Sequence, residues 1–82
     1  MHPLLFIING EKVPITASPE ETLAEARNVA LEVSKNTGRT TEDWEVRKDS
    51  GELLDVCQTV RELALERHER LFVTLRMGVG GS

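Results

Sequence analysis

The chain has 82 residues and a net charge of −4, and its 39% hydrophobic and 29% charged residues are ordinary for one small globular domain. Its lysines and arginines form no cluster, which argues against a nucleic-acid-binding protein, because such proteins place clustered cations on phosphates. The longest apolar run, residues 4–8, is far too short to cross a membrane.

The first predicted element is a β-hairpin. Residues 4–8 are apolar, β-branched or aromatic, and Asn9-Gly10 follows them. This dipeptide is the strongest short hairpin signal, because a type I′ turn needs positive φ at both central residues. Residues 11–17 alternate apolar and polar and form the second strand. Pro14 cannot donate to a β-ladder, so we expect this strand at a sheet edge.

The two-residue loop also sets the register of the hairpin and therefore its two faces. Leu5 and Ile7 fall on one face, away from the expected core. The core face is predicted to carry Leu4, Phe6, Val13 and Ile15.

The next predicted element is a helix that begins at Ser18. Ser18 is expected to cap the free amides, Pro19 suits the first helical position, and Glu21 completes a capping box. Residues 36–38 are expected to end the helix with a C-terminal glycine. Its apolar stripe is predicted to consist of Leu23, Ala26, Ala30 and Val33, with Val29 beside it.

Two further strands are predicted after a polar loop. Residues 44–48 alternate, which places Trp44 and Val46 inward. Residues 49–51 form a turn, and residues 52–56 are expected to form a short fourth strand.

The last part of the chain is predicted to hold a short helical segment and a final strand. Thr59 is expected to cap residues 60–63, with Glu62 in the capping-box position. Residues 71–76 form the last strand. The first and last strands are both strongly apolar, so we expect them side by side at the sheet centre, with the helix covering one face.

The single cysteine, Cys57, cannot form an internal disulfide, so a reducing, cytoplasmic compartment is expected. The N-terminal residues lack the regions of a signal peptide, and none is expected. No histidine lies at a telling position near Cys57, which is therefore expected to be a small core residue. His2 and His68 have no metal-ligand spacing, so no metal site is predicted. No nucleophile, base and orienting group occur together, and the chain is not expected to be an enzyme.

Residues 77–82 contain three glycines and almost nothing that packs, so they are predicted to be a flexible tail. A Gly-Gly near a C-terminus can thread a narrow enzyme channel that side chains would block. From these residues alone, a functional tail and a frayed end or cloning remnant are equally good interpretations.

This element order resembles ubiquitin and its β-grasp relatives over nearly the whole chain. The resemblance is carried by the hairpin of residues 4–15, the helix entry at residues 19–23, and residues 71–76 running into Gly80-Gly81. The chain differs in having three lysines, a Met-Gly-Val segment before the diglycine, and Ser82 beyond it. The pattern is more similar to the ubiquitin-like proteins of bacterial conjugation operons.

The resemblance implies an α+β fold of the ubiquitin-like β-grasp type, with a mixed sheet of four to five strands packed on one long helix. It divides the chain into a β-grasp domain over residues 1–76 and a flexible diglycine tail over residues 77–82.

The resemblance also implies a protein modifier. A processing or deconjugating protease, plausibly a zinc metallo-isopeptidase, would remove Ser82. An activating enzyme would adenylate the Gly81 carboxylate with ATP and Mg²⁺ and capture it as a thioester, and a conjugating enzyme would pass it to an amine of a target protein. The chain itself would hold no cofactor and no metal.

Two sets of recognition residues follow from the same resemblance. Arg76 and Gly80 would be recognised in the tail, although Arg76 also fits a solvated strand end. Leu5, Ile7 and Phe72 would form an exposed apolar patch for partners, unless long side chains cover it.

Two other functions stay open. The same Gly81 carboxylate serves a sulfur carrier as a thiocarboxylate, although such carriers usually end at the diglycine, which counts against this where Ser82 follows. Alternatively, the chain is a non-covalent ubiquitin-like interaction domain that never uses its tail.

Overall fold

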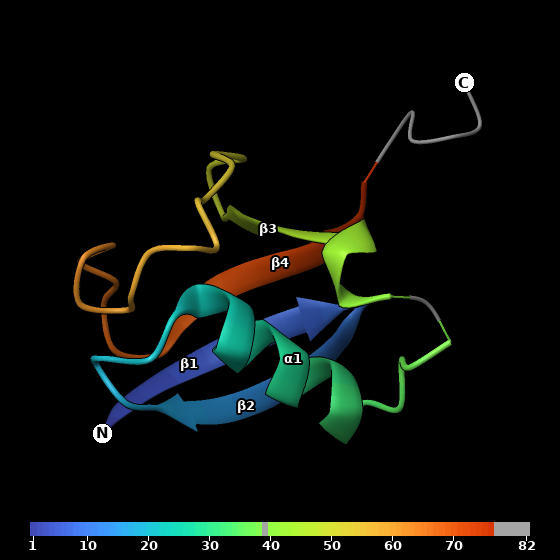
Figure 1. Ribbon diagram of the computed structural model, residues 1–82, viewed down its shortest axis with the longest axis horizontal. Coiled ribbons are helices and arrows are strands. Elements are labelled where there is room, and N and C mark those ends of the chain that lie inside the picture. Colours follow the sequence, from blue (N-terminus) through green and yellow to red (C-terminus); the bar gives the residue numbers. More distant parts are fainter. Residues whose placement is uncertain (39, 77–82) are drawn as a thin grey trace.

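The computed structural model describes residues 1–38 and 40–76. The predicted tail of residues 77–82, with Gly80, Gly81 and Ser82, lies outside the described residues. In chain order the elements are β1 (His2–Ile8), β2 (Glu11–Ala17), α1 (Leu23–Val33), the 3-10 turn η1 (Thr41–Asp43), β3 (Trp44–Lys48) and β4 (Glu69–Leu75) (Figure 1).

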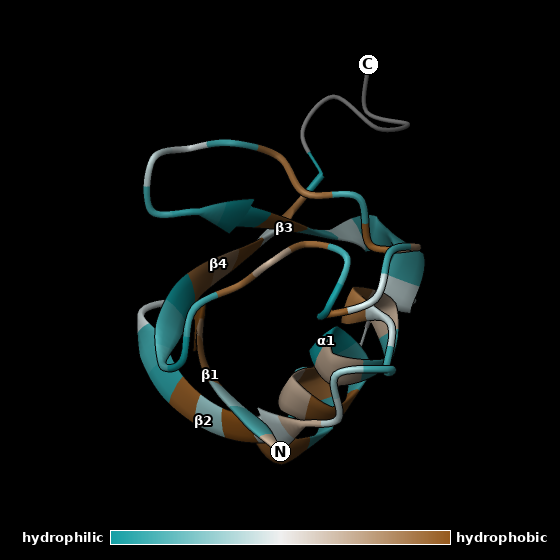
Figure 2. Cartoon of the chain, turned by 90° about the vertical axis from the view of Figure 1, so that its left-hand side faces the viewer, coloured by the Kyte–Doolittle hydropathy of each residue, from teal (hydrophilic) through white to brown (hydrophobic). Residues whose placement is uncertain are grey.

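The described strands form one mixed sheet in the order β2-β1-β4-β3. β1 pairs antiparallel with β2 and parallel with β4, and β4 pairs antiparallel with β3. The prediction that the first and last strands lie together at the sheet centre is therefore confirmed. Figure 2 shows the sheet curving around α1, which lies on its concave side.

The hairpin has the predicted turn and register. Asn9 and Gly10 have φ of 52° and 81°, as a type I′ turn requires. Phe6 lies opposite Val13 in the ladder. Because β2 is an edge strand, Pro14 faces no further ladder and is exposed.

The helix begins later than predicted, and the role given to Ser18 is wrong. Thr22 is the N-cap, and its Oγ1 accepts from the Glu25 N–H at 3.2 Å, while the Glu25 carboxylate accepts from the Thr22 N–H at 3.0 Å. Ser18 belongs to a separate turn in which its N–H donates to the Glu21 carboxylate at 3.0 Å. Both segments have the capping-box spacing, and the second one starts the helix.

The helix also ends earlier than predicted, and Gly38 does not terminate it. Lys35 takes the left-handed position with φ of 62°. Its N–H donates to the Glu32 carbonyl at 3.0 Å, and the Asn36 N–H donates to the Leu31 carbonyl at 2.8 Å. These two bonds form a Schellman motif with a lysine where glycine is usual. With both ends shortened, α1 has 11 residues, and the expected long helix is a short one.

The buried stripe of α1 differs from the predicted one at its C-terminal half. Val33, predicted on the stripe, is 59% exposed, and Val29, predicted beside it, is 41% exposed, so both predictions are wrong. The buried stripe runs from Leu23 through i+3, i+4, i+7 and i+8, so Val33 lies at its edge and Val29 further from its centre. The buried residues of the helix are Leu23, Ala26, Arg27, Ala30 and Leu31.

Residues 52–56 do not form the predicted strand. The described sheet has four strands, of which the last is β4, and not the five that this segment would give. The segment makes an isolated bridge between Leu53 and Arg47, and the Leu54 N–H donates to the Val46 carbonyl at 2.9 Å. Leu54 turns into the core. One anchored side chain and too few consecutive ladder bonds leave this segment as a loop.

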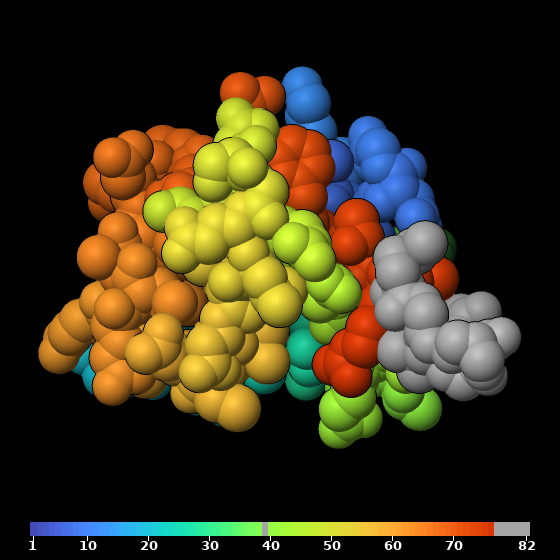
Figure 3. Space-filling view, turned by 90° about the horizontal axis from the view of Figure 1, so that it is seen from above, coloured from blue at the N-terminus to red at the C-terminus, as the bar shows by residue number. Residues whose placement is uncertain are grey.

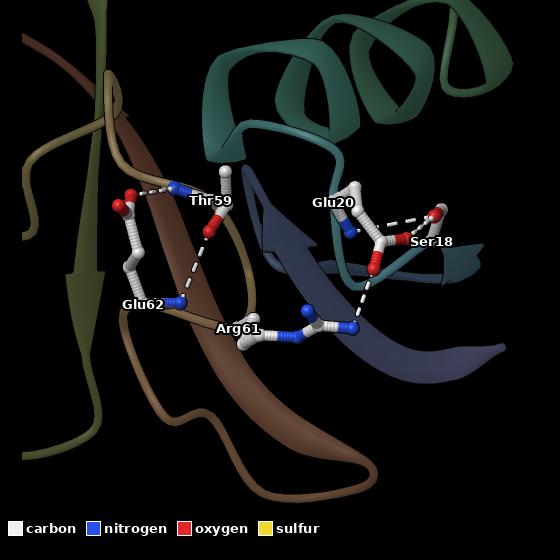
Figure 4. A network of polar contacts seen from close by, with 5 residues as sticks. All are labelled: Ser18, Glu20, Thr59, Arg61 and Glu62. Carbon is white, nitrogen blue, oxygen red and sulfur yellow. Dashed lines mark hydrogen bonds and ion pairs between the residues drawn. The ribbon is translucent and has the colours of Figure 1, made fainter.

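The predicted capping box at Thr59 is present, although it caps a turn and not a helix. The Thr59 N–H donates to the Glu62 carboxylate at 2.9 Å, and the Glu62 N–H donates to Thr59 Oγ1 at 3.0 Å (Figure 4). Ala64 then adopts a φ of 54°, which ends the turn.

This turn is fastened to the start of α1. The helix amides of Leu23 and Ala24 donate to the carbonyls of Gln58 and Val56, each at 2.9 Å. These distant carbonyls satisfy amides that a helix N-terminus otherwise leaves free.

An exposed ion pair between Arg61 and Glu20 lies beside the same fastening (Figure 4). The hydrogen bond from Ser18, together with the Arg61 guanidinium, lowers the pKa of the Glu20 carboxyl.

The core lies between the concave face of the sheet and α1. The largest fully buried side chains are Phe6, Leu4, Ile8, Leu23, Leu71, Val46, Val60 and Val73. The predicted core face of the hairpin is confirmed, with Ile15 packed against it as a partly buried residue. In the described part of the chain, no helix is long and apolar enough to cross a membrane.

Candidate functional site

Strand alternation places a row of side chains on the sheet face opposite α1. Ile7 of β1 lies opposite Phe72 of β4, and Lys12 and Arg47 extend the row on the two edge strands. Leu5, Ile7 and Phe72 are half-buried, whereas their neighbours along each strand are fully buried. These three residues define the outer patch, and the alternation within each strand together with the parallel pairing of β1 with β4 brings them together.

The outer patch continues into a shallow hollow at the hairpin end of the sheet. Ile7 and Phe72 line it together with Asn9, Gly10 and Thr74. Its lining has no titratable side chain, so it is suited to contact with another surface and not to acid–base chemistry.

Basic residues surround the outer patch. Arg70 lies opposite Leu5, and its guanidinium approaches Asp49 at 3.5 Å. Arg47 makes a 3.0 Å ion pair with Glu45. An apolar centre with a charged rim is the usual anatomy of a protein-contact surface.

Arg76 follows the end of β4 and is exposed. Its N–H donates to the Asp43 carbonyl at 2.7 Å. This bond holds the backbone in place immediately before residues 77–82. Of the predicted tail residues, Arg76 is described, whereas Gly80, Gly81 and Ser82 lie outside the described residues.

A second surface, which the sequence did not reveal, is an open groove of about 630 Å³ beside β3. We call it the Arg27 groove. Figure 3 shows the loop after β3 lying over this side of the molecule, next to β3 and the end of β4. The lining of the groove includes Arg27, Trp44, Leu53, Leu54, Cys57 and Arg76.

The Arg27 groove corrects one expectation and adds one residue. Cys57 is exposed and lines the groove, so its predicted place in the core is wrong. Arg27 is the one charged residue of the described chain that is classed as buried. A signal for it existed, since Arg27 lies four residues after Leu23 on the core stripe of α1.

The described residues contain no group of three or more His, Cys, Asp or Glu side chains placed to hold a metal ion. The two surfaces are instead an apolar patch and a groove with a buried cation.

Comparison with known proteins places the chain among ubiquitin-like folds. A family model described as "Protein of Unknown function (DUF2604)" matches residues 3–81. Over 79 residues the chain is 29% identical to "Uncharacterized protein y4jI" of Sinorhizobium fredii (strain NBRC 101917 / NGR234), with 96% of this chain and 61% of the relative covered. The chain thus spans about three-fifths of the length of that curated relative.

Two solved structures share the fold at low sequence identity. Caldiarchaeum subterraneum ubiquitin matches with a TM-score of 0.75 and 13% identity, over 96% of this chain and 98% of its own. A chain from the crystal structure of ATBAG1 in complex with HSP70 matches with a TM-score of 0.75 and 12% identity, over 95% of this chain and 42% of its own. These likenesses show a ubiquitin-like fold.

Proposed function

The chain belongs to the DUF2604 family, and we propose that it acts as a ubiquitin-like protein modifier joined to target amines through the carboxylate of Gly81. The observation that supports this function is the combination of a ubiquitin-like fold with a diglycine shortly after its last strand. Glycines lack Cβ atoms, so an extended Gly80-Gly81 segment fits a channel too narrow for side chains.

The proposed reaction sequence belongs to partner enzymes. A protease hydrolyses the bond after Gly81 and releases Ser82 with any residues beyond it. The Gly81 carboxylate attacks ATP, forming an acyl-adenylate and releasing pyrophosphate, and an enzyme thiolate then displaces AMP to form a thioester. After transfer to a second thiol, a target amine attacks the carbonyl, so that an amide forms and the thiol leaves. Adenylation gives the acyl group a good leaving group, and the thioester keeps it activated toward an amine, which the free carboxylate is not.

The described part of the chain supplies recognition surfaces for these partners. The bond from the Arg76 N–H to Asp43 fixes where the tail starts, and the exposed Arg76 guanidinium suits an acidic group of an activating enzyme. The outer patch serves the conjugating enzyme or the target complex. The proposal places the chain in the bacterial cytoplasm, where ATP and reduced thiols are available.

The test is replacement of Gly81 by alanine in an N-terminally tagged chain expressed in its native cells. The unchanged chain is expected to form adducts of higher mass, and Gly81→Ala is expected to abolish them. Trypsin cuts after Arg76, so a modified target lysine should carry residues 77–81 as a remnant detectable by mass spectrometry. Gly38→Ala is the matched control, since an added Cβ there meets no atom within 4 Å. Adducts that persist in Gly81→Ala would contradict the proposal.

A second candidate, a non-covalent interaction domain, is favoured by the likeness to a chain solved in a complex with HSP70. In that case no lysine remnant forms, and Gly81→Ala changes nothing. A sulfur carrier would instead show the trimmed chain with one carboxylate oxygen replaced by sulfur, and no adducts.

A further inference from the structure

The starting observation is the guanidinium of Arg27, a residue that is only 5% exposed. Its Nε donates to Asn28 Oδ1 at 3.1 Å, and its Nη1 donates to the Trp44 carbonyl at 3.1 Å. A guanidinium has five N–H donors, so most of its capacity is unused by these two bonds. Among the described residues, Arg27 forms no ion pair. None of its nitrogens is among the described buried side-chain atoms that lack a partner, so the remaining N–H groups are open to the groove and available to a ligand.

The surroundings of Arg27 act on its pKa in both directions. Burial lowers the pKa of Arg27, the nearby Arg76 lowers it further, and Glu42 opposes both. Glu42 is itself exposed on the rim of the groove. An added carboxylate in the groove would lie close to two cations and would compensate the buried one.

The other acidic groups of the groove are already engaged. Glu45 is paired with Arg47 at 3.0 Å, and Asp55 Oδ1 accepts from the Cys57 N–H at 2.9 Å. Glu42 is therefore the acidic rim residue left to face the guanidiniums of Arg27 and Arg76. The floor of the groove thus favours a single negative charge, although its rim is acidic.

The wall of the groove is apolar. Leu53 is 54% exposed although it is a large hydrophobic residue, and it lies beside the buried side chains of Leu54 and Trp44. An occupant that covered Leu53 would remove apolar surface from water while its carboxylate reached Arg27.

We propose that the Arg27 groove binds an extended segment of a partner protein in which a Glu or Asp side chain lies next to a large apolar residue. The carboxylate accepts hydrogen bonds from Arg27, and the apolar side chain packs on Leu53. Glu42 on the rim repels a doubly charged phosphate more strongly than a singly charged carboxylate, so a protein carboxylate is the better fit.

This site deepens the proposed function. Arg76 lines the groove and also precedes the diglycine, so a segment in the groove lies beside the start of the tail. The inference rests on the proposed function only in assigning the segment to an enzyme that handles the tail. Binding itself needs neither Gly81 nor an enzyme, and it is measured equally on the Gly81→Ala chain.

The test is a titration of the ¹⁵N-labelled chain, followed by NMR, with the blocked peptide acetyl-Ser-Leu-Glu-Leu-Ser-amide. The same peptide with Gln in place of Glu is the matched control. We expect saturable shifts of the Arg27 Nε–H, the Trp44 indole N–H and the Cys57 amide. The affinity of the Gln peptide should be lower by a factor of about ten or more, because a hydrogen bond to a charged group is lost.

Two variants extend the test. Leu53→Asp removes the apolar wall and adds a like charge at an exposed position, so it should abolish binding without unfolding the chain. Arg27→Lys keeps the charge but loses the planar donor fork, and it should weaken binding several-fold. Lys12→Met, on the opposite face of the sheet, should bind as the unchanged chain does.

Three results would overturn the proposal. They are equal affinity for the two peptides, shifts confined to the outer patch, and a response to inorganic phosphate with none to the Glu peptide.

Discussion

Lys35 shows how one residue ends α1 where the sequence does not indicate an end. Its φ of 62° lies in the left-handed region, which is unfavourable for a residue with a Cβ. The Schellman hydrogen bonds to the carbonyls of Glu32 and Leu31 hold the backbone in this conformation. Gly38, three positions later, is the more obvious terminator, but it has no such φ. The two backbone hydrogen bonds offset the energetic cost of this conformation at a non-glycine residue.

We predict that Lys35→Gly raises the free energy of unfolding by roughly 0.5–1 kcal/mol, since glycine adopts this conformation without a Cβ clash. Urea unfolding followed by circular dichroism measures the change. Gly38→Ala is the comparison, and it should not destabilise the chain because its Cβ would meet open space. A loss of stability in Lys35→Gly would show that the lysine side chain stabilises the fold in another way.

Arg27 is a second case at this scale. From sequence alone, a positively charged residue is not expected on the buried stripe of a helix, and the predicted stripe did not include Arg27. The structure places it at 5% exposure with its head directed to the Trp44 carbonyl. Its long stem packs like an apolar side chain while the guanidinium reaches the groove.

At the scale of elements, the start of α1 is decided between two capping boxes. Ser18–Glu21 and Thr22–Glu25 both have the right spacing, and the structure uses the first for a turn and the second for the helix. The amides of Leu23 and Ala24 donate to carbonyls of residues 58 and 56. These two hydrogen bonds need amides that have no partner within the helix, which is the case when the helix begins at Leu23.

The two capping boxes should therefore differ in their energetic contribution. Thr22→Ala is expected to lower the free energy of unfolding by about 1 kcal/mol, because it removes the acceptor for the Glu25 N–H. Ser18→Ala should cost less, because its hydroxyl bonds only exposed groups of Glu20. Thermal and urea unfolding of the two variants measure the difference, and a larger loss for Ser18→Ala would refute this assignment.

At the scale of the whole molecule, two surfaces on different sides of the sheet are available for contact. The outer patch lies on the face opposite α1, and the Arg27 groove lies between α1, β3 and the loop after β3. The fold thereby presents an apolar area on one side and a groove lined by Arg27 and Arg76 on another.

We predict that the double variant Ile7→Gln and Phe72→Gln reduces adduct formation at least about tenfold in the assay described for Gly81, because partner contacts concentrate in a few apolar residues. The variant should stay folded, since both side chains are half-buried and face away from the core. Val33→Gln, on the exposed face of α1, is the control and should leave the adducts unchanged. Unchanged adduct yield in the double variant would remove the outer patch from the proposal.

The features that the sequence by itself determined depend on neighbours a few residues apart. The Asn9-Gly10 turn fixes the hairpin register, and strand alternation then places Leu5 and Ile7 on the face opposite Leu4 and Phe6. The reciprocal bonds of Thr59 and Glu62 follow from a three-residue spacing. Local hydrogen bonds and side-chain periodicity need no knowledge of the rest of the chain.

Only the tertiary structure decided the features that depend on competition between distant segments. Residues 56–58 satisfy the first amides of α1 and so select Thr22 over Ser18, and residues 52–56 stay a loop because they meet β3 at one isolated bridge. The Arg27 groove is assembled from α1, β3, that loop and Arg76, which are far apart in the sequence. The physical reason is that each amide hydrogen-bonds to one partner and each apolar side chain packs at one position. Where the local sequence allows two structures, the long-range hydrogen bond or packing contact decides between them.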